Sequence, residues 1–230
     1  MSHDQNYYQA EKKIEEALKS GATKLDLSHI GYTGILDTLG DLTQLQELNL
    51  SNNQLSLLPE SLLQLTHLQS LNLLGNNLET LPDWFENLSQ LQSLNLSKNQ
   101  LTIFPSPLEK LTKLRKLNYT DNQVTEIPEW IEKLALLQNI NFYGNRLSEL
   151  PESFSNLKEL LHLGLGNNKI IKLPRQIQNL PILSKLLLHE NMIRVLPEWL
   201  GGLSALTVLT LDTNPLEELP DWLGRLKNLE

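Results

Sequence analysis

The sequence contains no cysteine, few aromatic residues and fewer basic than acidic residues. The lack of cysteine excludes disulfide bonds and thiolate metal sites, and it favours a reducing compartment. Lys and Arg number 19 against 27 Asp and Glu, and the resulting net charge of -8 disfavours binding to nucleic acid or anionic membranes. No apolar run approaches the roughly 20 residues of a membrane span, and no secretory signal is visible. We expect a cytoplasmic protein with no nucleic-acid or membrane partner.

Common catalytic patterns are also missing from the sequence. It has no GxSxG elbow, no GxxxxGK[ST] phosphate loop and no metal-spaced cluster of ligands. His162 and His189 fall on neighbouring predicted strands but four residues out of step, an offset of roughly 13 Å. Two imidazoles at that separation cannot share one zinc ion. We therefore expect no enzymatic activity, no cofactor and no metal site.

The sequence does contain a 23-residue unit that repeats eight times. The copies begin at Leu45, Leu68, Leu91, Leu114, Leu137, Leu160, Leu183 and Leu206. Numbered from that first leucine, positions 1, 4, 6, 11, 14, 18 and 21 are apolar in every copy. A fixed period of this kind predicts one elongated array of stacked units rather than one compact core.

Each copy predicts a short strand followed by a return segment. In the first copy Leu48 and Leu50 alternate with the polar residues Glu47, Asn49 and Ser51, which is typical of a strand with one buried face. Equivalent strands 23 residues apart must run parallel. Proline at position 15 of every copy ends the extended segment, and a short 3₁₀ or irregular helical return is expected after it.

Asparagine occupies position 9 of all eight copies. Its amide offers both a donor and an acceptor, so it can satisfy backbone groups that are buried where the chain turns between copies. We predict a structural asparagine ladder formed by Asn53, Asn76, Asn99, Asn122, Asn145, Asn168, Asn191 and Asn214.

The ends of the chain depart from the repeat. Residues 1–21 predict a capping helix from about residue 5 to 20, with Asp4 as its N-cap, although an interaction helix is the alternative. Its expected apolar stripe comprises Tyr7, Ala10, Ile14, Ala17 and Leu18. Residues 22–44 form a degenerate first repeat, with Ile30 and Leu36 at the asparagine and proline positions and Gly31 and Gly34 in a different loop.

The eight full repeats span residues 45–228, and residues 229–230 begin a ninth. No polar capping element follows, so the last core edge is expected to be exposed. We therefore predict that the chain was cut from a longer protein or that another subunit covers its end.

The pattern LxxLxLxxNxLxxLPxxLxxLxx resembles the 23-residue, Leu-Pro type of the leucine-rich repeat family over about residues 22–230. The resemblance implies an α/β fold, a right-handed horseshoe solenoid. Short parallel strands would line its concave face, and 3₁₀ or irregular helical segments its convex face. It also implies a role in protein recognition.

The N-terminal stretch YYQAEKKIEEALKSGATKLDLSHIGYTGIL is similar to the repeat region of bacterial, especially cyanobacterial, Roco proteins. In that family the repeats precede a Ras-like GTPase domain. The resemblance implies a regulatory module that docks on C-terminal domains of a longer parent protein. The present chain has no phosphate loop of its own.

Binding residues are expected at the outward strand positions 3, 5 and 7 and at flanking position 8, where the later copies differ from the earlier ones. Gly164 and Gly166 on one strand predict a trough between Tyr143 and His189, and exposed aromatic residues are enriched at binding hot spots. The predicted concave patch comprises Lys116, Tyr143, His162, Gly164, Gly166, Lys185, Leu187 and His189. The alternative is that these are surface residues without a partner.

All four tryptophans, Trp84, Trp130, Trp199 and Trp222, fall at position 17 on the convex side. They either cover the edges of the core or, at Trp199 and Trp222, form a second docking surface.

Taken together, these features favour a non-catalytic scaffold that binds a protein or peptide on its concave face. The regulatory module of a Roco-type GTPase is the alternative. A purely structural or designed array is disfavoured because the outward positions do not repeat.

Overall fold

The computed structural model describes residues 3–31 and 37–229, in two compact units. The first comprises Met1–Leu101 and Pro105–Lys116, and the second comprises Thr102–Phe104 and Leu117–Glu230. The predicted loop containing Gly34 and Leu36 lies outside the described residues.

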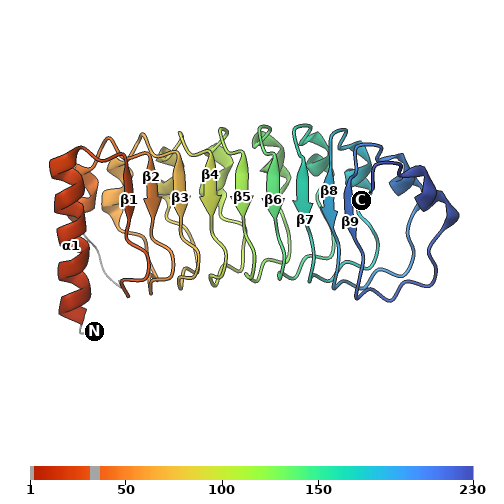
Figure 1. Ribbon diagram of the computed structural model, residues 1–230, viewed down its shortest axis with the longest axis horizontal. Helices are drawn as coiled ribbons and strands as arrows, with labels where there is room; N and C mark the ends of the chain where they lie inside the picture. The colour runs from red at the N-terminus through yellow and green to blue at the C-terminus, as the bar shows by residue number, and fades with distance from the viewer. Residues whose placement is uncertain (1–2, 32–36, 230) are drawn as a thin grey trace. The chain divides into compact units, whose positions relative to one another are not determined.

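The first unit holds an α-helix and four paired strands (Figure 1). Helix α1 (His3–Ser20) lies beside β1 (Lys24–Asp26), which is followed by β2 (Glu47–Asn49), β3 (Ser70–Asn72) and β4 (Ser93–Asn95). All four strands are parallel, and each residue pairs with the one 23 positions later, as Leu25 does with Leu48. The 3₁₀ helices of this unit are η1 (Asp37–Asp41), η2 (Glu60–Gln64), η3 (Asp83–Asn87) and η4 (Ser106–Lys110).

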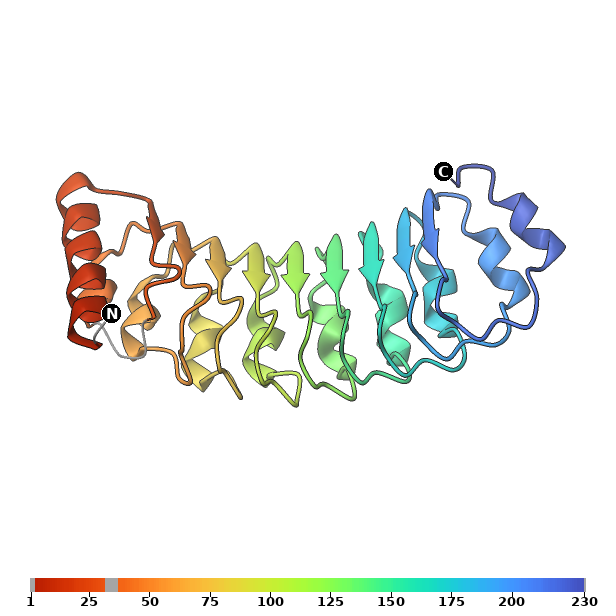
Figure 2. The same ribbon diagram turned by 60° about the horizontal axis from the view of Figure 1, so that its bottom comes forward.

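The second unit repeats the arrangement with β6 (Asn139–Asn141), β7 (His162–Gly164), β8 (Lys185–Leu187) and β9 (Val208–Thr210), again parallel and in the 23-residue register. Its 3₁₀ helices are η5 (Glu129–Lys133), η6 (Glu152–Asn156), η7 (Arg175–Asn179), η8 (Glu198–Gly202) and η9 (Asp221–Arg225). Strand β5 (Lys116–Asn118) contains the last residue of the first unit and continues into the second. Within each unit, Figure 2 shows strands on one side and 3₁₀ helices on the other.

The repeated leucines form the core between these two layers, and the leucine-rich repeat fold predicted from the sequence is confirmed. Leu48, Leu50, Leu55 and Leu62 are buried, and so are their equivalents in the later copies up to residue 206. The return segments begin directly after the position-15 prolines, as at Pro59, whose φ of -65° leads into η2. The last copy is less covered, and Leu219 is 70% exposed.

The position-9 asparagines bind backbone groups of two consecutive turns. Asn76 donates from Nδ2 to the carbonyl oxygens of Leu50 and Leu73, both at 3.0 Å, and its Oδ1 accepts the N–H of Leu55 at 3.1 Å. Equivalent bonds surround Asn99, Asn145, Asn168, Asn191 and Asn214. The ladder therefore joins asparagine side chains to main chain, with each one completing the turn of the copy before it.

Position 8 carries a backbone constraint that the sequence reading missed. Its residue has a positive φ in every copy, with Gly75 and Gly144 at 68° and 67°. The others are Asn52, Lys98, Asp121, Asn167, Glu190 and Thr213, with φ between 49° and 57°. This left-handed turn favours Gly, Asn and Asp, which explains much of the composition at this position.

Helix α1 covers the first repeat through a narrower stripe than the sequence predicted. Ala10, Ile14 and Ala17 are buried, whereas Tyr7 and Leu18 are 38% and 48% exposed. The stripe prediction was therefore wrong for Tyr7 and Leu18, because only the small or central side chains face the core. The helix begins at His3, so the proposed N-cap at Asp4 was also wrong. Within the described ranges, no helix is both long enough and apolar enough to cross a bilayer.

Replacing Asn168 by alanine should lower the free energy of unfolding by about 1–3 kcal/mol. The change leaves the carbonyls of Phe142, Leu165 and Gly166, at 2.9–3.1 Å, without their amide donor, and the N–H of Leu147 without its acceptor. Urea unfolding measures the loss. The exposed Asn179→Ala is the control and should change stability by less than about 0.5 kcal/mol. Equal effects of the two changes would contradict the prediction.

Candidate binding site on the strand face

In each unit we call the outward surface of the strands the strand face. Tyr143 and His189 meet on the strand face of the second unit. Each lies two residues beyond its strand, β6 or β8, and their rings stack at a centroid distance of 5.4 Å and an interplanar angle of 28°. The Tyr143 hydroxyl donates to Glu190 Oε2 at 3.3 Å, and His189 Nδ1 lies 3.0 Å from Thr210 Oγ1. These contacts hold two half-buried aromatic rings in one arrangement on a mainly polar surface.

The predicted open trough between these rings was wrong. A Cβ on Gly166 would lie 2.7 Å from Cε1 and 2.8 Å from Nε2 of His189, so the imidazole fills the space over this glycine. Gly164 is likewise covered by the side chain of Asn141. Because a glycine leaves room that a neighbouring side chain can enter, Gly166 allows the His189 ring to lie beside Tyr143, whereas Asn141 fills the space over Gly164.

Position 5 is asparagine in the first five full copies, and this polar row has a local structural role. Asn141 Oδ1 accepts the N–H of Tyr143 at 3.0 Å, and Asn49, Asn72, Asn95 and Asn118 accept in the same way from the residue two positions later. Such Asx turns stabilise the chain where it leaves each strand. The row ends in the second unit, where position 5 is Gly164 in one copy and Leu187 in the next. Neither residue has a side-chain amide that can form this turn.

Two of the other predicted patch residues of the second unit, His162 and Lys185, form what we call the basic edge. His162 pairs with Lys185 in the register of β7 and β8, and Gly164 pairs with Leu187. Partial burial and, secondarily, the charge of Lys185 lower the pKa of His162. His162 and Lys185 stand at position 3, opposite the position-7 end that carries Tyr143 and His189. Lys116 belongs to the first unit.

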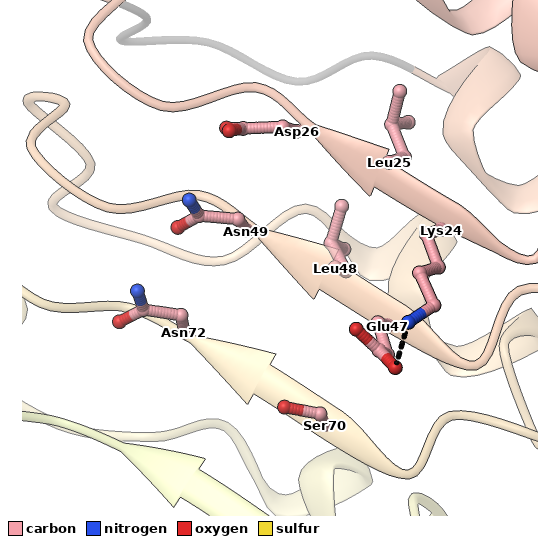
Figure 3. Close-up of a pocket in the computed structure, with 8 residues that line it drawn as sticks. All are labelled: Lys24, Leu25, Asp26, Glu47, Leu48, Asn49, Ser70 and Asn72. Carbon is pink, nitrogen blue, oxygen red and sulfur yellow. Dashed lines mark ion pairs between the residues drawn. The ribbon is translucent and has the colours of Figure 1, made fainter.

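The first unit has a hollow on its strand face that the sequence reading did not single out (Figure 3). It measures about 410 Å³ and lies over β1, β2 and β3. Lys24 Nζ and Glu47 Oε1 form an exposed ion pair at 2.7 Å on one side, and Asp26, Asn49 and Asn72 form a polar row on the other. Hydrogen bonds from Ser28 lower the pKa of Asp26, which keeps its carboxylate charged.

A second hollow of about 370 Å³ lies over neighbouring strands of the same unit. Ser70 and Ser93 stand between Glu47 and the cationic pair Arg115 and Lys116. The signal in the sequence was the pair of small residues at position 3 of consecutive copies, flanked by opposite charges. Of the predicted patch, Lys116 lines this hollow.

The tryptophans at position 17 are half buried in all four copies. Trp130 packs on Phe104 at a centroid distance of 5.3 Å, and the Trp222 ring would lie 3.0 Å from a Cβ added to Gly201. These contacts support a packing role at Trp130 and Trp222, while docking at Trp199 and Trp222 stays a prediction.

Comparison with protein families agrees with this geometry. The models described as "Leucine rich repeat" and "Leucine Rich Repeat" match residues 79–124 and residues 44–65, 67–88 and 136–157, respectively. The chain is a leucine-rich repeat protein. A comparison with curated proteins found no match.

Solved structures of other leucine-rich repeat proteins resemble the chain. A leucine-rich repeat protein of Leptospira interrogans has a TM-score of 0.82 and 34% identity over 85% of this chain and 50% of its own. Internalin C2 of Listeria monocytogenes has a TM-score of 0.78 and 27% identity over 87% of this chain and 91% of its own.

A receptor ectodomain is also similar. This is the plant membrane receptor kinase GASSHO1/SCHENGEN3 of Arabidopsis thaliana, with a TM-score of 0.70 and 31% identity over 92% of this chain and 30% of its own. It was solved in complex with CASPARIAN STRIP INTEGRITY FACTOR 2. The chain thus spans half of the Leptospira protein and less than a third of the plant ectodomain.

Gly166→Ala should break the stack between Tyr143 and His189, because the added Cβ would occupy the space of the imidazole ring. We expect the loss of nuclear Overhauser effects between the two rings, with a stability cost of about 1–3 kcal/mol from overpacking. Gly202→Ala is the control, since no atom lies within 4 Å of a Cβ at that position. Persistent ring contacts in the folded Gly166→Ala variant would contradict the arrangement.

Lys185→Gln should raise the pKa of His162, because it removes the smaller of two causes that lower it. The pKa should remain below its usual value, since burial persists. Titration of the His162 Hε1 resonance measures this change, and Lys158→Gln serves as the control.

In the unmodified protein, His162 has a lower pKa in the folded chain than in the unfolded chain, so on acidification the unfolded chain takes up the proton at a higher pH. His162 therefore lowers the free energy of unfolding as the pH falls through the usual histidine range.

Proposed function

We propose that this leucine-rich repeat protein is a non-catalytic module that binds a protein or peptide on its strand face. The observation that carries the proposal is the stack of Tyr143 on His189, fixed by Glu190 and Thr210. A preorganised aromatic surface loses little conformational entropy on binding, and tyrosine is enriched at binding hot spots. The Arabidopsis ectodomain solved with its bound factor supports the proposal by analogy.

The basic edge adds a second element to the proposed site. Lys185 is exposed, and Leu187 is half buried between this edge and His189. A partner that lies along β8 would therefore meet a cation at Lys185, an aliphatic side chain at Leu187 and the aromatic pair at His189 in succession. Such a sequence of contacts suits an extended or loop segment of a folded partner.

The regulatory module of a Roco-type GTPase is the narrower alternative. It rests on the N-terminal stretch that leads into the first repeat, and it would place the partner surface on C-terminal domains of the same parent chain. For either case we propose a cytoplasmic location, which agrees with the lack of cysteine.

The double variant Tyr143→Ala/His189→Ala should weaken partner binding by about 2 kcal/mol or more, about thirty-fold in Kd, because it removes the anchor pair. The partner is recovered from a lysate with the unmodified chain as bait, and its affinity is then measured by calorimetry. Leu74→Ala is the matched control, since Leu74 holds position 7 in the first unit as Tyr143 does in the second. Undiminished affinity of the folded double variant would refute the proposed site.

A further inference from the structure

Two consecutive copies carry cationic and apolar residues in the segment just after the position-9 asparagine, where the other copies are mainly polar or acidic. At positions 10, 12 and 13 the copy at 160–182 has Lys169, Ile171 and Lys172. The next copy, at 183–205, has Met192, Arg194 and Val195 at the same positions. We call these six residues the flank cluster. At the same positions the preceding copy holds Arg146, Ser148 and Glu149, and the following copy holds Pro215, Glu217 and Glu218.

The backbone places the two copies side by side here. The N–H of Met192 donates to the carbonyl oxygen of Ile170 at 2.9 Å, and the N–H of Lys169 donates to that of Leu147 at 2.8 Å. Direct bonds between extended segments set a spacing of about 4.8 Å. Apolar and cationic side chains therefore alternate along each copy and also between the two copies, where Met192 is at the position equivalent to Lys169.

The apolar members of the flank cluster are open to solvent. Ile171, Met192 and Val195 are 57%, 50% and 64% exposed. Single exposed aliphatic residues are ordinary, but here three lie within two adjacent copies, each beside a cation.

The cations of the cluster are available for a partner. Among the residues that the structure describes, Lys169, Lys172 and Arg194 form no ion pair, although the chain as a whole has a net charge of -8. A local basic area on an acidic protein attracts an acidic ligand and repels a basic one.

A hollow of about 470 Å³ adjoins the cluster. Its apolar lining includes Leu150, Leu173, Pro174 and the exposed Ile171. Lys172 and Arg175 line the same hollow, as do Glu149 and Glu152, and Glu152 accepts a hydrogen bond from Gln176 at 3.0 Å. The hollow thus offers an apolar surface for an aliphatic side chain, with two cations and two carboxylates in its lining.

We infer that the flank cluster binds a short partner segment in which aliphatic side chains alternate with aspartate or glutamate. The aliphatic groups contact Ile171, Met192 and Val195, and the carboxylates pair with Lys169, Lys172 and Arg194. A protein segment fits better than a membrane, because Glu149 precedes the cluster and Glu217 and Glu218 follow it at the equivalent positions. A membrane would also face the rest of the chain, whose net negative charge repels anionic lipid. The cluster lies beyond the asparagine turn, apart from the ring stack on the strand face, so the two surfaces can be tested separately.

A random-peptide display library selected on the intact chain tests the inference, followed by anisotropy titration of the enriched peptide. We expect enriched sequences with Asp or Glu interleaved with Leu, Ile or Val. Lys172→Glu/Arg194→Glu and, separately, Ile171→Ser/Val195→Ser should each weaken the enriched peptide about tenfold or more. Leu57→Ser is the matched control, because Leu57 holds the position of Val195 in the first full copy and is 72% exposed. It should change the Kd less than about twofold. Raising NaCl from about 0.05 M to about 0.5 M should weaken binding several-fold.

Several results would overturn the inference. These are recovery of no peptide, recovery of peptides without acidic residues, or affinity that neither flank variant changes. Tyr143→Ala/His189→Ala should leave this peptide bound, and its release would place the peptide on the strand face instead. A different outcome would assign the cluster to a membrane surface. In that case the library yields no acidic peptide, the unmodified chain binds phosphatidylserine vesicles, and the Lys172→Glu/Arg194→Glu variant does not bind them.

Discussion

The buried amide of the position-9 asparagine is the interaction on which the rest of the structure depends. Each copy must reverse direction beside its strand, and this leaves main-chain donors and acceptors away from water. The Asn145 amide donates to the carbonyls of Tyr119, Phe142 and Tyr143 and accepts one bond, from the N–H of Val124. An unsatisfied buried polar group costs about 1–3 kcal/mol, so no apolar residue can replace this amide without loss in an interior copy. The leucine core stabilises the stack, but the amide determines where the chain turns.

The same turns decide which outward residues remain available for binding. Position 5 is occupied by Asx turns in most copies, and position 8 is restricted by a left-handed backbone. Position 3 on each strand, position 7 just after it, and positions 10, 12 and 13 beyond the turn carry fewer constraints. The ring stack at position 7 and the flank cluster beyond the turn both use these freer positions. Variation at a position is therefore informative only after the structural requirement at that position is known.

The fold was predictable from the sequence because each buried position admits few residue types and recurs every 23 residues. Strands, register and 3₁₀ segments all follow from leucine, asparagine and proline at constant spacing. The site was less predictable, since side-chain direction is not periodic. The sequence identified Tyr143, His189 and the two glycines but not that the imidazole lies over Gly166. Asp121 lies in the same way over Gly144. The second hollow of the first unit was missed because its signal, Ser70 and Ser93 between charged neighbours, is weaker than a motif.

The first repeat illustrates how far the asparagine side chain reaches. Ile30 occupies the asparagine position there, yet its N–H is bound by Oδ1 of Asn53 at 3.2 Å, from the following copy. Asn53 also donates to the carbonyl of Leu27 at 2.9 Å. Each turn thus receives part of its hydrogen bonds from the asparagine of the following copy. The array consequently has a polarity: a copy inserted anywhere must bring the amide that its predecessor needs, so the repeats can lengthen or shorten only in whole units.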